Sequence, residues 1–326
     1  MGFHEDSLVD TICEIYVDIS RLESLKPSVD VNILFTKLVL TCIPPCSIDV
    51  NKLSRRVQEI RAKLIKLCGE AEGHLESHFS EILTSHSEPL DQLTIFPYYS
   101  NYLKLSHLEF NILSEYSTKI PNSVAFVGSG PLPLTSIVLA LNHLKTTEFH
   151  NYDINPKANL QASRLIDNHP DLSERMFFHT TDILAAGDQL GDYDVVFLAA
   201  LVGMDKHEKM KVVSHLSKHM APNSILMLRS AHGARAFLYP VVDPCELHGF
   251  EVLSVYHPTD EVINSVIIAR KLDVNNSKLD VNDCNMEIMA SAAHKILPNK
   301  CLEIEAFNPL IHGGMVEEVA VEERVS

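Results

Sequence analysis

Two glycines and a proline follow a short apolar stretch in the middle of the chain. Residues 123–127 are mostly apolar, and the turn after them consists of Gly128, Ser129, Gly130 and Pro131. Glycines in such a turn let the backbone adopt positive φ and approach a ligand, and the N–H groups that open the next helix can bind polar or anionic groups. A dinucleotide fingerprint would place a third glycine where this chain has Pro133. The turn therefore favours a nucleoside without a pyrophosphate over NAD.

Polar and small residues follow the next three apolar stretches. Asp153 lies 23 residues after Gly130, at the end of a predicted second strand, where a carboxylate can bind both ribose hydroxyls. Asp182 follows the third strand and can reach the adenine edge, and Ala200 follows the fourth and leaves room for a ligand. This combination is typical of the class I S-adenosylmethionine fold. It leaves open whether a methyl, an aminopropyl or an aminocarboxypropyl group is transferred.

Basic residues lie just after the predicted fifth strand. Arg229 and Arg235 are placed at the sheet edge where ligands bind in such folds, and a guanidinium can grip a carboxylate with two hydrogen bonds. Tyr239 follows them and can assist. A structural salt bridge is the alternative role for each arginine.

The pattern of elements predicts two structural regions and a tail. Residues 1–118 carry apolar positions at helical spacing, including one long helix over 53–83 in which Gly69 and Gly73 mark a bend or a close approach. In residues 119–272 short apolar strands alternate with helices, which predicts an α/β domain with a mainly parallel sheet and two antiparallel strands at its end. Residues 273–326 form an acidic C-terminal tail.

Composition excludes several classes of protein. The chain of 326 residues has a formal net charge of −16, so nucleic acid and anionic membranes are poor partners. No apolar run approaches the ~20 residues that cross a bilayer, and the first residues do not resemble a signal peptide. Seven cysteines at irregular spacing are typical of reduced thiols. We therefore expect a cytoplasmic protein without a membrane span; the oligomeric state is not indicated.

Two pairs of histidines provide the basis for a different function. They have the i, i+4 spacing that can hold zinc on a helix, and they are His74 with His78 and His215 with His219. Neither pair has an obvious third ligand. A non-catalytic protein that binds a metal or a nucleoside stays as an alternative on this basis.

Longer strings give a specific resemblance. Those that resemble nicotianamine synthase, in its plant form, are residues 127–135 (VGSGPLPLT), 152–156 (YDINP), 197–204 (FLAALVGM), 229–239 (RSAHGARAFLY) and 96–102 (FPYYSNY). The resemblance covers about residues 1–272 and implies a class I Rossmann-like α/β domain with an N-terminal all-helical cap domain.

The resemblance also implies a reaction. Members of this family join three aminocarboxypropyl units taken from S-adenosylmethionine, release three molecules of methylthioadenosine and close an azetidine ring. It implies that Glu76 and Tyr102 are catalytic, that S-adenosylmethionine is both donor and acceptor, and that no metal or other cofactor is required. The product chelates Fe, Zn, Cu and Ni, which implies a role in metal homeostasis. A small-molecule methyltransferase on the same fold stays as the alternative, and it would release S-adenosylhomocysteine instead.

Overall fold

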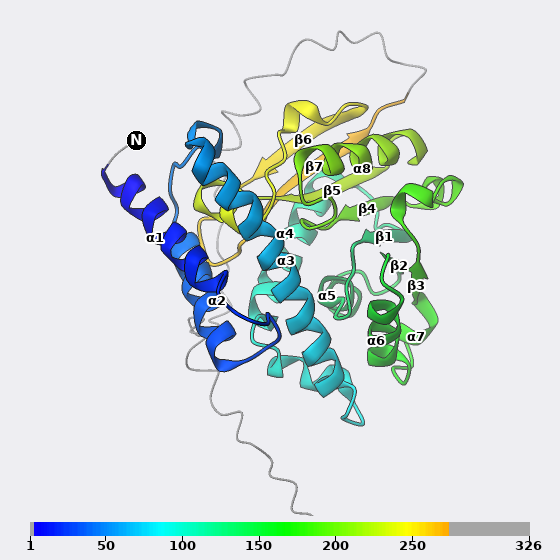
Figure 1. Cartoon of the computed structure of the whole chain (residues 1–326). Coiled ribbons are helices and arrows are strands. Elements are labelled where there is room, and N and C mark those ends of the chain that lie inside the picture. The colour runs from blue at the N-terminus through cyan, green and yellow to red at the C-terminus, as the bar shows by residue number, and fades with distance from the viewer. Residues whose placement is uncertain (1–2, 274–326) are drawn as a thin grey trace, which may run out of the picture.

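The computed structural model describes residues 3–273 and shows a layered α/β architecture, as the sequence predicts (Figure 1). The predicted tail, 273–326, lies outside the described residues except for its first position. The α-helices are α1 (Phe3–Ile19), α2 (Val29–Cys42), α3 (Arg55–Leu83), α4 (Tyr99–Tyr116), α5 (Leu134–Asn142), α6 (Pro156–Ile166), α7 (Leu172–Arg175) and α8 (Lys206–His219). Short 3-10 helices connect them at η1 (Val50–Lys52), η2 (Pro89–Ile95), η3 (Ile183–Ala185), η4 (Asp188–Asp192), η5 (Gly233–Phe237) and η6 (Pro244–Glu246).

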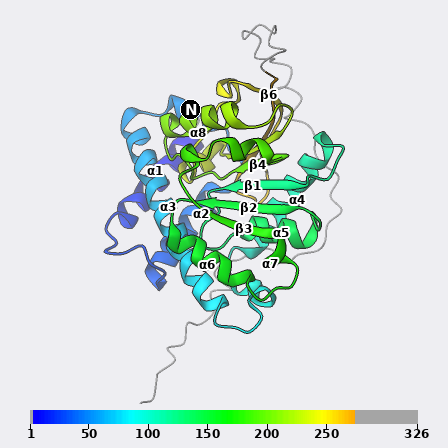
Figure 2. The same cartoon turned by 90° about the vertical axis from the view of Figure 1, so that its right-hand side faces the viewer.

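Seven strands form one sheet with the order β3-β2-β1-β4-β5-β7-β6. Their bounds are β1 (Ser123–Val127), β2 (Glu148–Asp153), β3 (Met176–Thr180), β4 (Val195–Leu198), β5 (Ile225–Ser230), β6 (Phe250–Tyr256) and β7 (Ser265–Lys271). The first five strands are parallel, whereas β7 runs antiparallel to both β5 and β6. Figure 2 shows β1, β2 and β3 side by side with α5, α6 and α7 beside them. The sequence prediction of a mainly parallel sheet that ends in an antiparallel pair is confirmed.

Two of the helices that precede the sheet, α2 and α3, begin at serine side chains that cap them. Ser28 accepts a hydrogen bond from the N–H of Val31 at the start of α2, and Ser54 accepts one from Val57 at the start of α3. Such caps satisfy N–H groups that have no partner within the helix. The long helix α3 then runs past the carboxyl ends of the strands (Figure 1).

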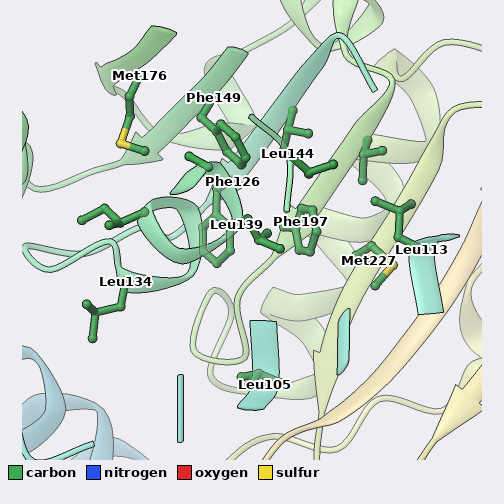
Figure 3. Packing of buried hydrophobic residues seen from close by; sticks show 14 of the residues in the cluster. Leu105, Leu113, Phe126, Leu134, Leu139, Leu144, Phe149, Met176, Phe197 and Met227 are labelled. Carbon is green, nitrogen blue, oxygen red and sulfur yellow. The ribbon is translucent and has the colours of Figure 1, made fainter. Parts of the chain in front are cut away.

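Two hydrophobic cores join the N-terminal helices to the α/β part. Leu105 and Leu113 of α4 belong to the same cluster of buried residues as Phe126 and Phe197 of the strands, and Figure 3 labels all four. A second core contains residues of α1, α2 and α3 together with Phe237 and its neighbours after β5. The helices are therefore fixed against the sheet by shared apolar burial.

Glycines in α3 have different surroundings. A Cβ on Gly69 would lie 3.2 Å from Cε of Met204, in the loop after β4, whereas a Cβ on Gly73 would have no heavy atom within 4 Å. The close approach that the sequence suggests is thus found at Gly69.

The cysteines match the prediction of reduced thiols only in part. Cys13, Cys42, Cys46 and Cys68 are free, but Cys245 is disulfide-bonded, contrary to the prediction. Separately, none of the helices within residues 3–273 has the length and apolar character needed to span a membrane.

Candidate active site

A cavity of about 980 Å³ lies between α3 and the carboxyl ends of the parallel strands. Nearly all of the predicted site residues line it, and they are Glu76, Tyr102, Gly128, Ser129, Gly130, Pro131, Asp153, Asp182, Ala200, Arg229 and Tyr239. Ligands in open α/β sheets bind at this edge. The one predicted site residue that does not line the cavity is Arg235.

One end of the cavity is built from the turns that follow β1 and β2. Gly128 and Gly130 have φ values of 82° and 67°, which explains why glycine occupies both positions. The carboxylate of Asp153 accepts hydrogen bonds from the N–H of Gly130 (2.9 Å) and of Asn155 (2.8 Å). These two bonds fix the carboxylate beside the glycine turn. We call this part of the cavity the turn end.

Three more predicted residues complete the turn end. Asp182 opens the loop after β3 and accepts a hydrogen bond from the N–H of Leu184. Ala200 is buried after β4. Ser129 is buried as well, and its hydroxyl has no hydrogen-bond partner within the described part of the chain.

Acidic and phenolic side chains gather at the other end of the cavity, which we call the acid end. The hydroxyl of Tyr102, on α4, donates a hydrogen bond of 3.1 Å to Oε1 of Glu76, on α3. A Cβ on Gly130 would lie 2.6 Å from Oε2 of Glu76. The carboxylate of Glu76 therefore lies directly against the glycine turn, where the two ends of the cavity meet.

Glu72 is a member of the acid end that the sequence analysis missed. Its Oε2 accepts a hydrogen bond of 3.0 Å from Tyr239, and its Oε1 accepts a longer one of 3.5 Å from Tyr102. The signal that could have found it is its spacing, because residues i and i+4 share one helix face and Glu72 lies four positions before Glu76.

Burial raises the pKa of both acids. Desolvation is the largest cause for Glu76, whose pKa lies well above the usual value, and the nearby charge of Glu72 raises it further. Burial also raises the pKa of Glu72, although hydrogen bonds from Tyr239 oppose this. A carboxyl with a raised pKa can act as a general base near neutral pH.

Arg229, at the end of β5, is held by a buried ion pair. Its Nε and Nη2 donate to the two carboxylate oxygens of Glu109 at 2.7 and 2.9 Å, and Nη2 also donates to Thr135 at 2.7 Å. Glu109 is fully buried on α4. The side chain of Arg229 is thus fixed in the cavity wall, 5.4 Å from the ring centroid of Phe126. Sequence reasoning missed Glu109, because a glutamate in a helix is ordinarily solvated.

Arg235 lies in η5, outside the cavity. Its guanidinium donates to backbone carbonyls, at 2.7 Å to Ile43 and also to Pro258 and Asp260. These bonds connect the end of α2 to the loop before β7. The structure therefore does not bring Arg235 together with Arg229. Arg235 binds backbone carbonyls, where the sequence analysis offered a salt bridge as the structural alternative.

Lys209 of α8 holds the backbone of the loop after β4, next to Ala200 of the turn end. It is buried, and its Nζ donates to the carbonyls of Ala199 and Ala200 at 3.1 and 2.9 Å. Burial lowers the pKa of this lysine to about 7. No pattern in the sequence indicates this role, since a lysine near the start of a helix is usually exposed.

Neither histidine pair belongs to a group of three or more possible metal ligands among residues 3–273. Within residues 3–273, no group of three or more His, Cys, Asp and Glu side chains could hold a metal ion. The rings of His215 and His219 contact each other at 4.5 Å, and His74 lies 3.8 Å from Glu70. Each pair therefore has the i, i+4 spacing but no third metal ligand beside it in the described part of the chain.

The strand order and this strand-edge cavity define a Rossmann-like α/β enzyme of the class typical of S-adenosylmethionine-dependent transferases. A family model described as "Nicotianamine synthase protein" matches residues 3–276. The chain belongs to the nicotianamine synthase family.

Known proteins agree with this assignment. Nicotianamine synthase of Solanum lycopersicum is 61% identical over 322 residues, which cover 98% of this chain and 99% of that protein. Nicotianamine synthase 3 of Arabidopsis thaliana is 65% identical over 274 residues, 83% of this chain and 86% of the relative. Among solved structures, MtNAS in complex with MTA and tNA superposes with a TM-score of 0.69 at 20% identity and covers 84% of this chain and 100% of its own. A mutant of MtNAS in complex with S-adenosylmethionine gives a TM-score of 0.67, also at 20% identity, and covers 81% and 98% of the two chains. These two structures support the fold.

Proposed function

We propose that this chain condenses three molecules of S-adenosylmethionine into nicotianamine by successive 3-amino-3-carboxypropyl transfers. In each of the first two transfers, the amine nitrogen of one molecule attacks the carbon of the aminocarboxypropyl chain that is bonded to the sulfonium of another molecule. A C–N bond forms and the C–S bond breaks, and its electron pair stays on sulfur, so that neutral methylthioadenosine leaves. The last transfer is intramolecular and closes the azetidine ring.

Glu76 is the proposed general base. The attacking amine is protonated near neutral pH and must lose a proton to become a nucleophile. The observation that carries this proposal is the position of Glu76, because its carboxylate lies against Gly130 of the turn end and accepts a hydrogen bond from Tyr102. A nucleoside bound at the turn end would have its sulfonium near this carboxylate. Tyr102 would orient the carboxylate or the amine.

The remaining residues supply binding in this proposal. Asp153 would accept hydrogen bonds from the ribose hydroxyls, and Asp182 would reach the adenine edge. Gly128 and Ala200 would leave room for the nucleoside. Arg229 and Tyr239 would face the carboxylates of the growing chain. We propose that no metal and no other cofactor is required, that nucleic acid is not a partner, and that the enzyme is cytoplasmic.

A single incubation tests the reaction. Purified protein is given S-adenosylmethionine alone, with a chelator and without an added acceptor, and the products are identified by mass spectrometry. We expect methylthioadenosine and a product of three joined units in a ratio of about three to one, as the stoichiometry of the bonds requires. Release of S-adenosylhomocysteine, or no product until an acceptor is added, would instead support a small-molecule methyltransferase on the same fold. Activity only after a metal is restored would overturn the metal-free part of the proposal.

A further inference from the structure

Asn264 is a buried polar residue in the cavity wall to which no role has been given so far. It lies immediately before β7, its exposed fraction is 8%, and it lines the same cavity as Glu76 and Arg229. Its Nδ2 has no hydrogen-bond partner within residues 3–273. Buried amide donors are nearly always paired, so an unpaired one at the edge of a binding cavity indicates that a ligand supplies the acceptor.

The register of the sheet sets Asn264 close to Arg229. Arg229 is paired with Val266 across the antiparallel strands β5 and β7. Directly paired residues share one face of a sheet, and so do residues two positions apart. Asn264 lies two residues before Val266 and one position before β7 begins, and both Asn264 and Arg229 line the cavity.

Arg229 also has donor capacity left over. Glu109 and Thr135 occupy its Nε and Nη2, and none of these three hydrogen bonds uses Nη1. Because Glu109 and Thr135 hold the guanidinium in place, the free donor has a fixed direction.

Both groups are hydrogen-bond donors, and one of them is a cation. An ammonium group would be repelled by Arg229 and could not accept from either residue. A carboxylate can accept from both, and hydrogen bonds between a carboxylate and a guanidinium are among the strong ones. The pair therefore fits a carboxylate and does not fit an amine.

We propose that Asn264 and Arg229 together bind an α-carboxylate of the substrate, with Asn264 as a specificity-determining residue. This inference rests on the proposed function, which supplies a substrate whose transferred unit carries a carboxylate. Asn264 thus takes the place of Arg235, which lies outside the cavity, as the second residue that binds the carboxylate with Arg229. The amine of the same unit would then face the acids of the acid end, opposite the donor pair.

Three ligands that differ in one group test the proposal. S-adenosylmethionine carries the carboxylate, decarboxylated S-adenosylmethionine lacks only that group, and methylthioadenosine lacks the whole aminocarboxypropyl unit. Their affinities are measured by calorimetry in the Glu76→Gln protein, in which turnover is expected to be absent, with and without Asn264→Leu. Leucine is close to asparagine in shape and has no donor.

We expect Asn264→Leu to weaken the binding of S-adenosylmethionine by roughly tenfold or more, which is typical of a lost hydrogen bond to a charged group. The affinities for the other two ligands should change less than about twofold, because neither ligand has the carboxylate. Asn264→Asp should give the same pattern with a larger loss, since it adds a repelling charge. This second variant also serves if the leucine variant does not fold.

Ser106→Ala is the matched control. Ser106 is buried and its hydroxyl also lacks a partner among the described residues, but it does not line the cavity. This control should leave all three affinities unchanged. An equal loss for all three ligands in the Asn264 variants, or an unchanged affinity for S-adenosylmethionine, would overturn the proposal. Because the affinities do not depend on turnover, this result is separate from a failure to form nicotianamine.

Discussion

The two ends of the cavity are stabilised in different ways. At the turn end, the carboxylate of Asp153 is held by backbone N–H groups of Gly130 and Asn155, close to it in the fold. At the acid end, Glu72 and Glu76 are held by phenolic hydroxyls from other elements, and both carboxyls are withdrawn from water. The turn end is preformed by backbone hydrogen bonds, whereas the acid end keeps acidic groups in an environment that disfavours their charge.

This difference matches two tasks. A binding surface that is already hydrogen-bonded loses little order when a ligand arrives. Buried Glu76 and half-buried Glu72 repel each other, and desolvation disfavours both charges, so a cationic amine or sulfonium would relieve both costs. Variants at the acid end should therefore change kcat, whereas variants at the turn end should change the affinity for the nucleoside.

Glu76→Gln should give the largest effect, and it should fall on catalysis. Glutamine keeps an acceptor for Tyr102 but cannot take a proton, so we expect kcat to fall by about 10²–10⁴-fold. The affinity for S-adenosylmethionine should stay nearly the same, because the turn end is intact. Release of methylthioadenosine and calorimetry measure the two quantities. Glu59→Gln, on the exposed face of α3, is the control, and full activity of the Glu76 variant would remove Glu76 as the base.

Asp153→Ala should give the reverse pattern. Loss of charge-assisted hydrogen bonds to the ribose costs about 1.5–3 kcal/mol each, or roughly ten- to hundredfold in the dissociation constant. Methylthioadenosine should lose as much affinity as S-adenosylmethionine, since both carry the ribose. Calorimetry with both ligands checks this, with the exposed Asp167→Ala as the control. An unchanged affinity would mean that Asp153 has no contact with the ribose.

The turn end could be predicted from the sequence and the acid end could not. Gly128 and Gly130 come directly after β1 and Asp153 is the last residue of β2, so local patterns alone place them at one sheet edge. Glu76 and Tyr102 were named only through the family resemblance, because nothing local distinguishes a buried glutamate on a helix from a solvated one.

Residues that depend on long-range packing were missed for the same reason. Glu109 is 120 positions from Arg229 in the sequence, and its pairing exists only once α4 packs against the sheet. The unpaired donor of Asn264 is equally invisible, since it is defined by what surrounds it. Arg235 is the opposite case. Its position after β5 suggests a ligand role, whereas in the fold its donors bind carbonyls at the end of α2 and in the loop before β7.

Glu72→Gln should sharpen the comparison through pH. The proposed base must be unprotonated, so transfer should rise as pH increases through the raised pKa of Glu76. Removal of the Glu72 charge removes one cause of that raised pKa, and the rising limb of kcat/KM should move to lower pH.

Stability should respond to the same two groups. A carboxyl whose pKa is raised on folding contributes stability that is fully present below its unfolded pKa and is lost as pH rises through the folded value. The free energy of unfolding of Glu72→Gln should therefore fall less steeply with rising pH than that of the unchanged protein. Glu72→Asp keeps the charge and is the control. A rising limb that stays in place in the glutamine variant would show that the two acids are not coupled.

The smallest effects should come from the two glycines of α3, which separate helix propensity from contact with the turn end. Gly73 is exposed and a Cβ there meets nothing within 4 Å, so Gly73→Ala should stabilise the protein by ~0.5–1 kcal/mol. At Gly69 the new Cβ would lie 3.2 Å from Met204 and 3.5 Å from Leu201, in the loop that follows Ala200. The Met204 side chain must give way by a few tenths of an ångström, which offsets the gain in helix propensity. Gly69→Ala should thus raise the melting temperature less than Gly73→Ala, and it should weaken methylthioadenosine binding more. Thermal unfolding measures the melting temperatures, and calorimetry measures the affinities. If both variants raise the melting temperature equally and leave the affinity unchanged, the contact of α3 with this loop does not shape the turn end.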